Sequence, residues 1–255
     1  MFCSKKISVS LAAVSGAVLT AVLLVLAGLP LSVQAAQVAQ AAQAKTPAQI
    51  IGSSVKLFVN NDDEANHRSG SGFFVDPTGC LLTVAHVVID LDKNTPADKI
   101  EVAVVKDIKR KPEIIGLGEV RYFDPEVDVA LVCIKTSDFF PALALAEPGA
   151  VASLDFGDAL KISGFPLSGS DTVTFAPSTI IGFWNDPDLK KIGGADKINA
   201  SRVNLIKTNG ISGPGGSVSP VLDKDDKVVA MMFAGQQSSA VPGLSITVDS
   251  FRNWE

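Results

Sequence analysis

The chain has 255 residues and a formal net charge of −5, and it is 47% hydrophobic and 19% charged. This length is enough for one large domain or for two small ones that share a cleft. No block of like charges stands out, and the acidic balance argues against nucleic acid as a partner, because phosphate binding needs a basic face.

The N-terminal segment has the pattern of a secretory signal peptide. Lys5 and Lys6 precede a long, uncharged and mostly apolar run that ends in small residues. We expect cleavage near Ala35 or Ala36, so that residues 1–36 are removed and the product is exported, either to the periplasm or into the medium. The rival interpretation is an uncleaved anchor, because the run exceeds the ~20 residues that span a bilayer. Only in that case would the protein contact a membrane.

Residues 37–52 are rich in Ala and Gln, and we expect them to form a linker. From Ser53 onward, apolar runs such as SVKLFV, LLTVAHVV and VVAMMFA alternate with turn-forming clusters such as DPTG and FDPE. This alternation is typical of strands joined by hairpins. We predict an all-β domain over residues 53–255, either a barrel or a sandwich. An interruption around Pro148 divides it into two halves of similar length, at about 53–145 and 150–255.

Of the three cysteines, Cys3 would leave with the signal peptide. Cys80 and Cys133 remain in an oxidising compartment, where a disulfide can persist. Two separate buried thiols explain the same residues equally well, since a free cysteine behaves as a small hydrophobe. The sequence leaves both alternatives open.

A serine hydrolase site needs a base, an acid that orients the base, and backbone amides for the oxyanion. Of the two histidines, His67 lies in the polar stretch NNDDEANHRSGSG and is expected to be solvated. His86 ends the run LLTVAH, where it can face a cleft or serve as a structural residue. In RYFDPEVDVALVCI, Asp124 precedes a proline and belongs to a turn. Asp128 begins an apolar strand, where an ionised carboxylate is costly unless it is hydrogen-bonded.

The candidate nucleophile is Ser217, in the stretch SGPGGSVSP. The glycines before it let the backbone bend, so that the amides of Gly215 and Ser217 can converge on one oxygen. A plain glycine-rich turn is the alternative interpretation. Neither Cys80 nor Cys133 lies in this loop, which argues against a cysteine nucleophile.

Three stretches together resemble the trypsin/chymotrypsin-like serine peptidases, most closely the bacterial exported HtrA-type branch. They are GSGFFVDPTGCLLTVAHVV, FDPEVDVALVCI and IKTNGISGPGGSVSPVLDKDDKVVAMMFAG. They resemble the family's Gly-Ser-Gly strand with its Thr-x-x-His segment, its Asp-x-Ala-Leu strand and its Pro-Gly-x-Ser loop, in that order. The resemblance covers most of the chain from Ser53. It implies two six-stranded antiparallel β-barrels, the chymotrypsin-like fold, with the active site in the cleft between them.

Carried over to this chain, the resemblance implies a Ser-His-Asp triad. His86 is the general base and then the general acid, Asp128 fixes its tautomer, and Ser217 is the nucleophile. The amides of Gly215 and Ser217 form the oxyanion hole. Asp128 is chosen over Asp124 because it stands immediately before Val-Ala-Leu, as in the family.

The same resemblance implies a primary specificity pocket lined by Ile211, Phe233, Ala234 and Gly235. No acidic residue lies in these stretches. A preference for Arg or Lys is therefore disfavoured, and we expect a small or medium apolar substrate side chain.

The chain departs from the family directly after the nucleophile, where Val218 and Ser219 stand in place of glycines. Valine is a poor occupant of a backbone position that needs a positive φ. A loop displaced by 1 Å can lose ~100-fold in rate. Since the chain ends at Glu255, just past the expected last strand, we also expect no C-terminal PDZ module.

The leading hypothesis is an exported serine endopeptidase that acts on proteins or peptides. The alternative is a trypsin-fold protein with weak or no peptidase activity that binds peptides or proteins, because of Val218. A metal-dependent hydrolase is disfavoured, since the two histidines are far apart and no HExxH motif occurs. We expect neither a metal nor a cofactor.

Overall fold

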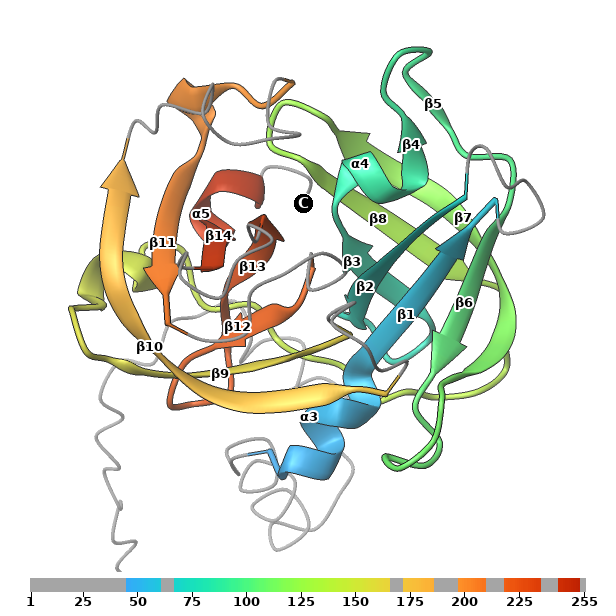
Figure 1. Ribbon diagram of the computed structural model, residues 1–255, viewed down its shortest axis with the longest axis horizontal. Coiled ribbons are helices and arrows are strands. Elements are labelled where there is room, and N and C mark those ends of the chain that lie inside the picture. Colours follow the sequence, from blue (N-terminus) through green and yellow to red (C-terminus); the bar gives the residue numbers. More distant parts are fainter. Residues whose placement is uncertain are drawn as a thin grey trace, which may run out of the picture. The chain divides into compact units, whose positions relative to one another are not determined.

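The computed structural model describes residues 45–60, 67–165, 172–185, 197–209, 218–234 and 243–252. These residues form two closed six-stranded barrels of antiparallel strands (Figure 1). The strand order is β1-β2-β3-β8-β7-β6 in the first barrel and β10-β11-β14-β13-β12-β9 in the second. The predicted all-β fold with two six-stranded barrels is confirmed. The expected signal peptide lies outside the described residues.

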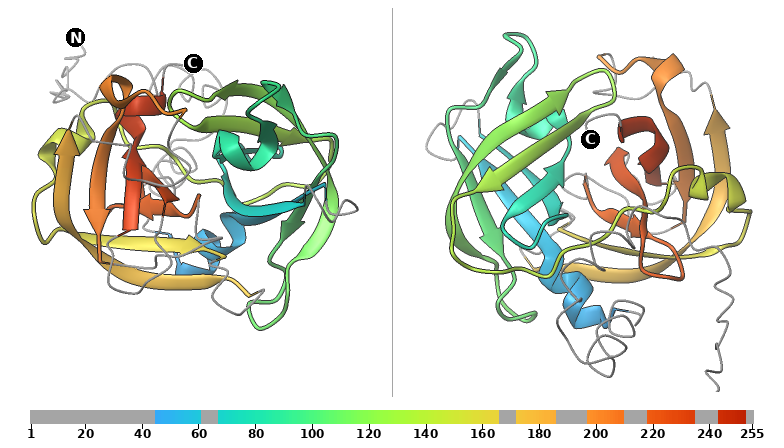
Figure 2. Two further views of the ribbon diagram at one scale, coloured as in Figure 1. Left: turned by 45° about the horizontal axis from the view of Figure 1, so that its top comes forward. Right: turned by 180° about the vertical axis from the view of Figure 1, so that it is seen from behind.

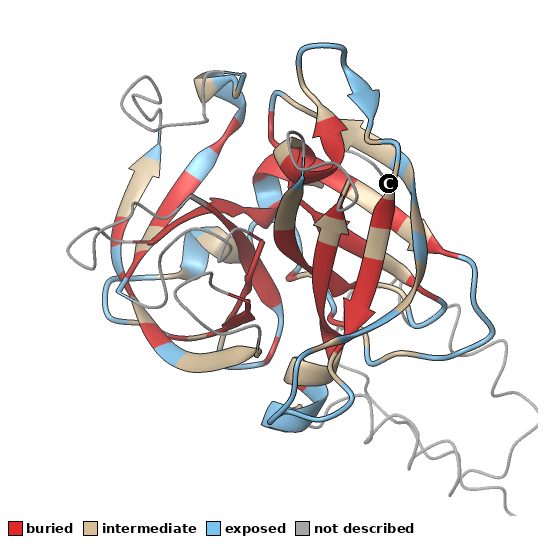
Figure 3. Ribbon diagram, turned by 45° about the vertical axis from the view of Figure 1, so that its right-hand side comes forward, coloured by how far each residue is buried: buried red, intermediate tan, exposed pale blue. Residues whose placement is uncertain are grey.

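Between its strands, the described residues of the first barrel also form a short helix and a small hairpin. Its strands are β1 (Ser54–Val59), β2 (Arg68–Phe74), β3 (Cys80–Thr83), β6 (Ile100–Val104), β7 (Glu113–Asp124) and β8 (Val129–Ile134). Helix α4 (Ala85–Val88) and the hairpin of β4 (Ile89–Asp90) and β5 (Thr95–Pro96) follow β3. The β-branched and aromatic side chains of the strands fill the interior, which is why long stretches of the ribbon are buried (Figure 3).

The second barrel is built from β9 (Ala159–Gly164), β10 (Thr174–Asn185), β11 (Asn204–Thr208), β12 (Pro220–Leu222), β13 (Val228–Ala234) and β14 (Gly243–Thr247). Two 3-10 helices, η1 (Ala150–Ser153) and η3 (Ala200–Arg202), precede β9 and β11, and helix α5 (Val248–Phe251) follows β14. The chain between β8 and β9, where the sequence showed an interruption, runs from one barrel to the other (Figure 2).

Cys80 and Cys133 stand opposite each other on β3 and β8 and form a disulfide. Their Cα atoms are 4.1 Å apart, and 53 residues separate them in sequence. Of the two alternatives that the sequence left open, the structure has the disulfide.

The end of the expected linker is folded. Residues Pro47–Ser53 form helix α3, whose N-terminus is closed by a capping box in which the side chains of Thr46 and Gln49 each accept a hydrogen bond from the other residue's backbone amide. Ile50 on this helix is fully buried. The Lys45 amide donates a 2.7 Å hydrogen bond to the buried carboxylate of Asp226, between β12 and β13. Within the described parts of the chain, no helix is both long and apolar enough to cross a bilayer.

Buried side-chain hydroxyls take part in two of the hydrogen bonds that join the barrels. The hydroxyls of Ser54 on β1 and Ser163 on β9 are 2.7 Å apart. The amide of Phe165, just after β9, donates a 3.1 Å hydrogen bond to the hydroxyl of Ser71 on β2. Because both contacts are shielded from water, they fix β1 and β2 of the first barrel relative to β9 of the second.

Candidate active site

His86 is carried by helix α4, directly after β3. The helix can pack close to β2 because Gly70 has no side chain: a Cβ at that position would lie 2.8 Å from a methyl carbon of Val87. Thr83, at the end of β3, donates a 2.9 Å hydrogen bond from its hydroxyl to the carbonyl of Ser71. The Gly-Ser-Gly and Thr-x-x-His patterns therefore have a shared physical role, which is to seat α4 on the barrel.

Asp128 lies in the turn between β7 and β8 and contacts His86 through both carboxylate oxygens. Its Oδ2 is 2.8 Å from the Nδ1 of His86, and its Oδ1 accepts a 2.9 Å hydrogen bond from the His86 amide. The Asp128 side chain is 5% exposed, whereas the His86 side chain is 33% exposed. The carboxylate is thus enclosed behind an imidazole that keeps access to solvent.

The charge state of His86 is set by two opposing influences. Burial lowers the pKa of the imidazole, but the negative charge of Asp128 and the hydrogen bond to it raise the pKa by more. The positive charge of Arg68 gives a smaller lowering. The net result is a His86 pKa above its usual range, because the protonated ring is stabilised by the adjacent carboxylate.

The loop with the candidate nucleophile is described only from Val218 onward. Ser217, Gly215 and Ile211 lie outside the described residues, as does Gly235. Val218 is fully buried and adopts a φ of 79°, in the left-handed region that glycine prefers. The backbone at this position therefore has the conformation that makes valine a poor occupant.

Backbone hydrogen bonds hold this left-handed residue against β13. The Val218 amide donates to the carbonyl of Met232, and the Met232 amide donates a 3.0 Å bond to the carbonyl of Ser219. Of the expected pocket residues, Phe233 on β13 is 4% exposed. Ala234 ends the same strand, and its side chain is not among those described.

The sequence pattern of the trypsin-like peptidase domain matches residues 70–231. This chain belongs to the trypsin-like peptidase family. The matched range begins at Gly70 on β2 and ends on β13, so it includes both members of the His86–Asp128 pair.

Relatives of this trypsin-like peptidase domain include HtrA- and DegP-type proteins. HhoA of Synechocystis sp., which is named as a serine protease, is 30% identical over 71% of this chain and 40% of its own length. A DegP-like protein of Pseudomonas fulva, named as a periplasmic serine endoprotease, is 28% identical over 64% of this chain and 28% of its own length. The chain thus spans less than half of these curated relatives.

The solved structures show the same fold. The HtrA-type protease AlgW, determined with a tripeptide, superposes with a TM-score of 0.58 at 21% identity. The match covers 80% of this chain and 60% of AlgW. At this identity the likeness supports the two-barrel architecture and no finer statement.

Of the sequence candidates for the base and the acid, all of which lie in the described part of this peptidase domain, the structure brings His86 and Asp128 together and leaves Asp124 and His67 outside the pair. Asp124 contacts Arg202 instead of His86, and His67 is exposed. The sequence analysis did not anticipate two arginines near the pair. Arg68 donates hydrogen bonds to the carbonyls of His86 and Ile89, and Arg202 donates hydrogen bonds to Asp124 and Glu126. No local motif marks either arginine, because their partners are distant in sequence.

Proposed function

We propose that this chain is an exported serine endopeptidase that uses a Ser217–His86–Asp128 triad. The observation that carries the proposal is the His86–Asp128 pair, with a buried carboxylate 2.8 Å from Nδ1 and a solvent-accessible imidazole. In this arrangement Nδ1 carries the proton that is donated to Asp128, so Nε2 is free to act as a base.

The proposed reaction has two stages. The Ser217 hydroxyl attacks the scissile carbonyl carbon while His86 Nε2 takes its proton, and the amides of Gly215 and Ser217 stabilise the oxyanion. The C–N bond then breaks, with the leaving amine taking the proton from His86, and an acyl-enzyme remains. Water, activated by the same imidazole, releases the acid and restores Ser217.

A fluorophosphonate probe tests the nucleophile directly. We expect the purified protein to gain one covalent adduct by intact mass, and Ser217→Ala to gain none. Ser219→Ala is a matched control two residues away, since Ser219 is fully buried and its hydroxyl has no hydrogen-bond partner in the described part of the chain. Correctly folded protein that does not react would refute the enzymatic proposal.

The second candidate function is peptide or protein binding without turnover, and the φ of 79° at Val218 favours it. A strained residue beside the nucleophile can displace the loop that carries it. The two candidates are separated by Val218→Gly. If the wild type does not react with the probe and Val218→Gly does, the binding function is supported and the geometry of the loop is the reason.

Export and substrate choice are part of the same proposal. Export rests on the signal-like residues 1–36 and on the periplasmic assignment of the Pseudomonas fulva relative. We propose an apolar substrate side chain of small or medium size at the scissile bond. Intact mass of the exported protein shows whether cleavage occurs near Ala35, and a peptide library cleaved mainly after Arg or Lys would contradict the specificity.

A further inference from the structure

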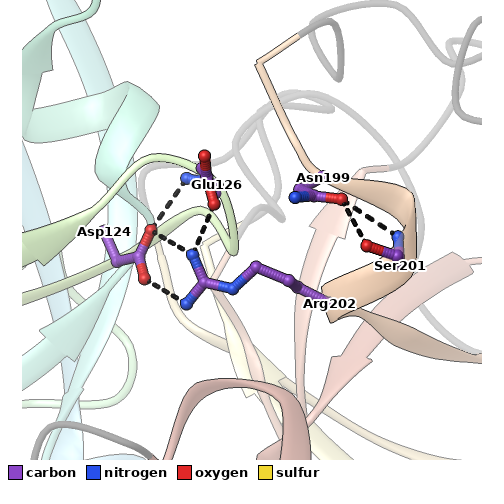
Figure 4. A network of polar contacts seen from close by, with 5 residues as sticks. All are labelled: Asp124, Glu126, Asn199, Ser201 and Arg202. Carbon is purple, nitrogen blue, oxygen red and sulfur yellow. Dashed lines mark hydrogen bonds and ion pairs between the residues drawn. The ribbon is translucent and has the colours of Figure 1, made fainter.

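Arg202 links the second barrel to the turn that carries Asp128. It ends η3, just before β11, while Asp124 ends β7 of the first barrel and Glu126 lies in the turn between β7 and β8. The guanidinium donates a 2.6 Å hydrogen bond to Glu126 Oε2 and another of 2.6 Å to Asp124 Oδ2 (Figure 4). One nitrogen also lies 3.4 Å from the other oxygen of Asp124.

The same turn is held at two further points. The Asp124 carboxylate accepts a 2.9 Å hydrogen bond from the Glu126 amide, and the Glu126 carbonyl accepts a 2.8 Å bond from the Asn199 amide. Asn199 in turn caps η3 by accepting a hydrogen bond from the Ser201 amide (Figure 4). The position of Glu126 is therefore set from the second barrel through both its side chain and its backbone.

This turn needs external support because Asp128 adopts a φ of 52°. A non-glycine residue in the left-handed region is strained and persists only when its surroundings hold it. With that φ, Asp128 turns both of its oxygens toward His86. A relaxed turn would move the carboxylate away from the imidazole.

We propose that Arg202 is a positioning residue that holds Asp128 against His86 from the opposite barrel. It touches neither residue and acts through Asp124 and Glu126. The inference rests on the proposed function, since Asp128 is there the residue that orients the base.

The strength of this contact follows from its geometry and burial. The Asp124 side chain is 15% exposed and that of Arg202 is 35% exposed, so solvent screens the pair only in part. The guanidinium contacts two carboxylates at short distances, which is the stronger kind of charged hydrogen bond. By contrast, Arg121 on β7 pairs with Glu119 at 3.1 Å, with both side chains at least half exposed. Such an isolated surface pair contributes little.

The test compares Arg202→Met with Arg121→Met, which removes an arginine that pairs with a carboxylate on β7 of the first barrel. In the purified full chain, the imidazoles are titrated by NMR, and the rate of fluorophosphonate labelling is measured in parallel. The chain has two histidines, so the exposed His67 serves as an internal reference. The charged groups that face His86 are Asp128 and Arg68, and neither is altered in these variants.

In Arg202→Met we expect the pKa of His86 to fall, because burial still opposes the protonated ring while the Asp128 contact weakens. Labelling should slow by about tenfold to a hundredfold, as for other small displacements of a catalytic group. Arg202→Lys should recover part of both effects, since a lysine keeps the charge but not the two-pronged contact. In Arg121→Met, the His86 titration and the labelling rate should equal those of the wild type. The His67 signal, as the internal reference, should be the same in all variants.

An unchanged His86 titration in folded Arg202→Met would overturn the proposal. Should that variant fail to fold, Asp124→Asn takes its place, with a fall of the His86 pKa expected and an unchanged pKa counting against the proposal. The NMR readout needs no turnover. If the wild type never reacts with the probe, the proposed function fails, while the titration still decides the role of Arg202.

Discussion

Cys80 and Cys133 are joined across β3 and β8, and the same strand pair leads to both members of the candidate catalytic pair. β3 runs from Cys80 to Thr83 and continues into the helix with His86. β8 begins directly after Asp128 and runs toward Cys133. The disulfide therefore closes one end of a two-stranded unit whose other end holds His86 against Asp128.

Removal of the disulfide should destabilise the fold. For Cys80→Ala combined with Cys133→Ala we expect a loss of about 2–5 kcal/mol in the free energy of unfolding, because the unfolded chain regains the entropy of a long loop. Urea unfolding of the wild type and of the double variant, each with and without reductant, measures this loss of stability. Reductant should lower the wild-type midpoint and leave that of the double variant unchanged; equal midpoints for all four samples would contradict the expectation.

The raised pKa of His86 predicts opposite pH trends for activity and stability. Labelling of Ser217 requires the neutral imidazole, so its rate should rise with pH through the raised His86 pKa. The charged pair stabilises the fold fully below the unfolded-state pKa of about 6.5, and this contribution is lost as pH rises through the folded-state pKa.

These trends are checked by labelling rates and by urea unfolding of the wild type and His86→Gln across the pH range. The stability difference between the two proteins should shrink from acid toward alkaline pH. A difference that grows with pH would mean that the folded-state pKa of His86 is lowered instead.

At position 218, a glycine variant should be more stable than an alanine variant, which reverses the usual order of stability. Glycine normally costs roughly 0.5–1 kcal/mol relative to alanine. At a φ of 79° an L-residue costs roughly 1–2 kcal/mol, which glycine avoids. We therefore expect Val218→Gly to be more stable than Val218→Ala by about 1 kcal/mol, although both lose the buried side chain. Val221→Gly and Val221→Ala are the controls on β12, where φ is not positive and alanine should be the more stable of the two.

Arg68 should affect stability and the pKa of His86 in different ways. Its guanidinium donates hydrogen bonds of 3.1 Å and 2.7 Å to the carbonyls of His86 and Ile89, at the end of α4. Arg68→Met should lower the free energy of unfolding by about 1–3 kcal/mol, since two partly buried carbonyls lose a charged donor. It should also raise the pKa of His86, because a nearby positive charge is removed. The exposed Arg110, changed to Met, should do neither.

The sequence identified the parts of the site that are encoded locally. His86 and Asp128 stand in short motifs at strand ends, and Val218 breaks an expected glycine pattern, so each could be recognised from its neighbours. The two-barrel fold followed from the resemblance, because alternating apolar runs alone fit a sandwich as well as a barrel.

The unpredicted features depend on long-range packing. Arg202 meets Asp124 across 78 residues, and Cys80 meets Cys133 across 53. No local sequence pattern indicates a contact between residues that are so far apart in the sequence. Helix α3 is a different case: the Thr46 and Gln49 capping box was readable, but the Ala- and Gln-rich composition around it suggested a linker.

The attachment of Lys45 determines how mechanical load enters the molecule. Tension applied through the preceding chain reaches Lys45 first, and there the amide is held by Asp226, which also pairs with Lys161 on β9. The next element, α3, packs against β1 and β9 together. A pull on the N-terminal side is thus shared between the two barrels where α3 packs, so only part of it passes through β1 toward the helix and the turn that carry His86 and Asp128.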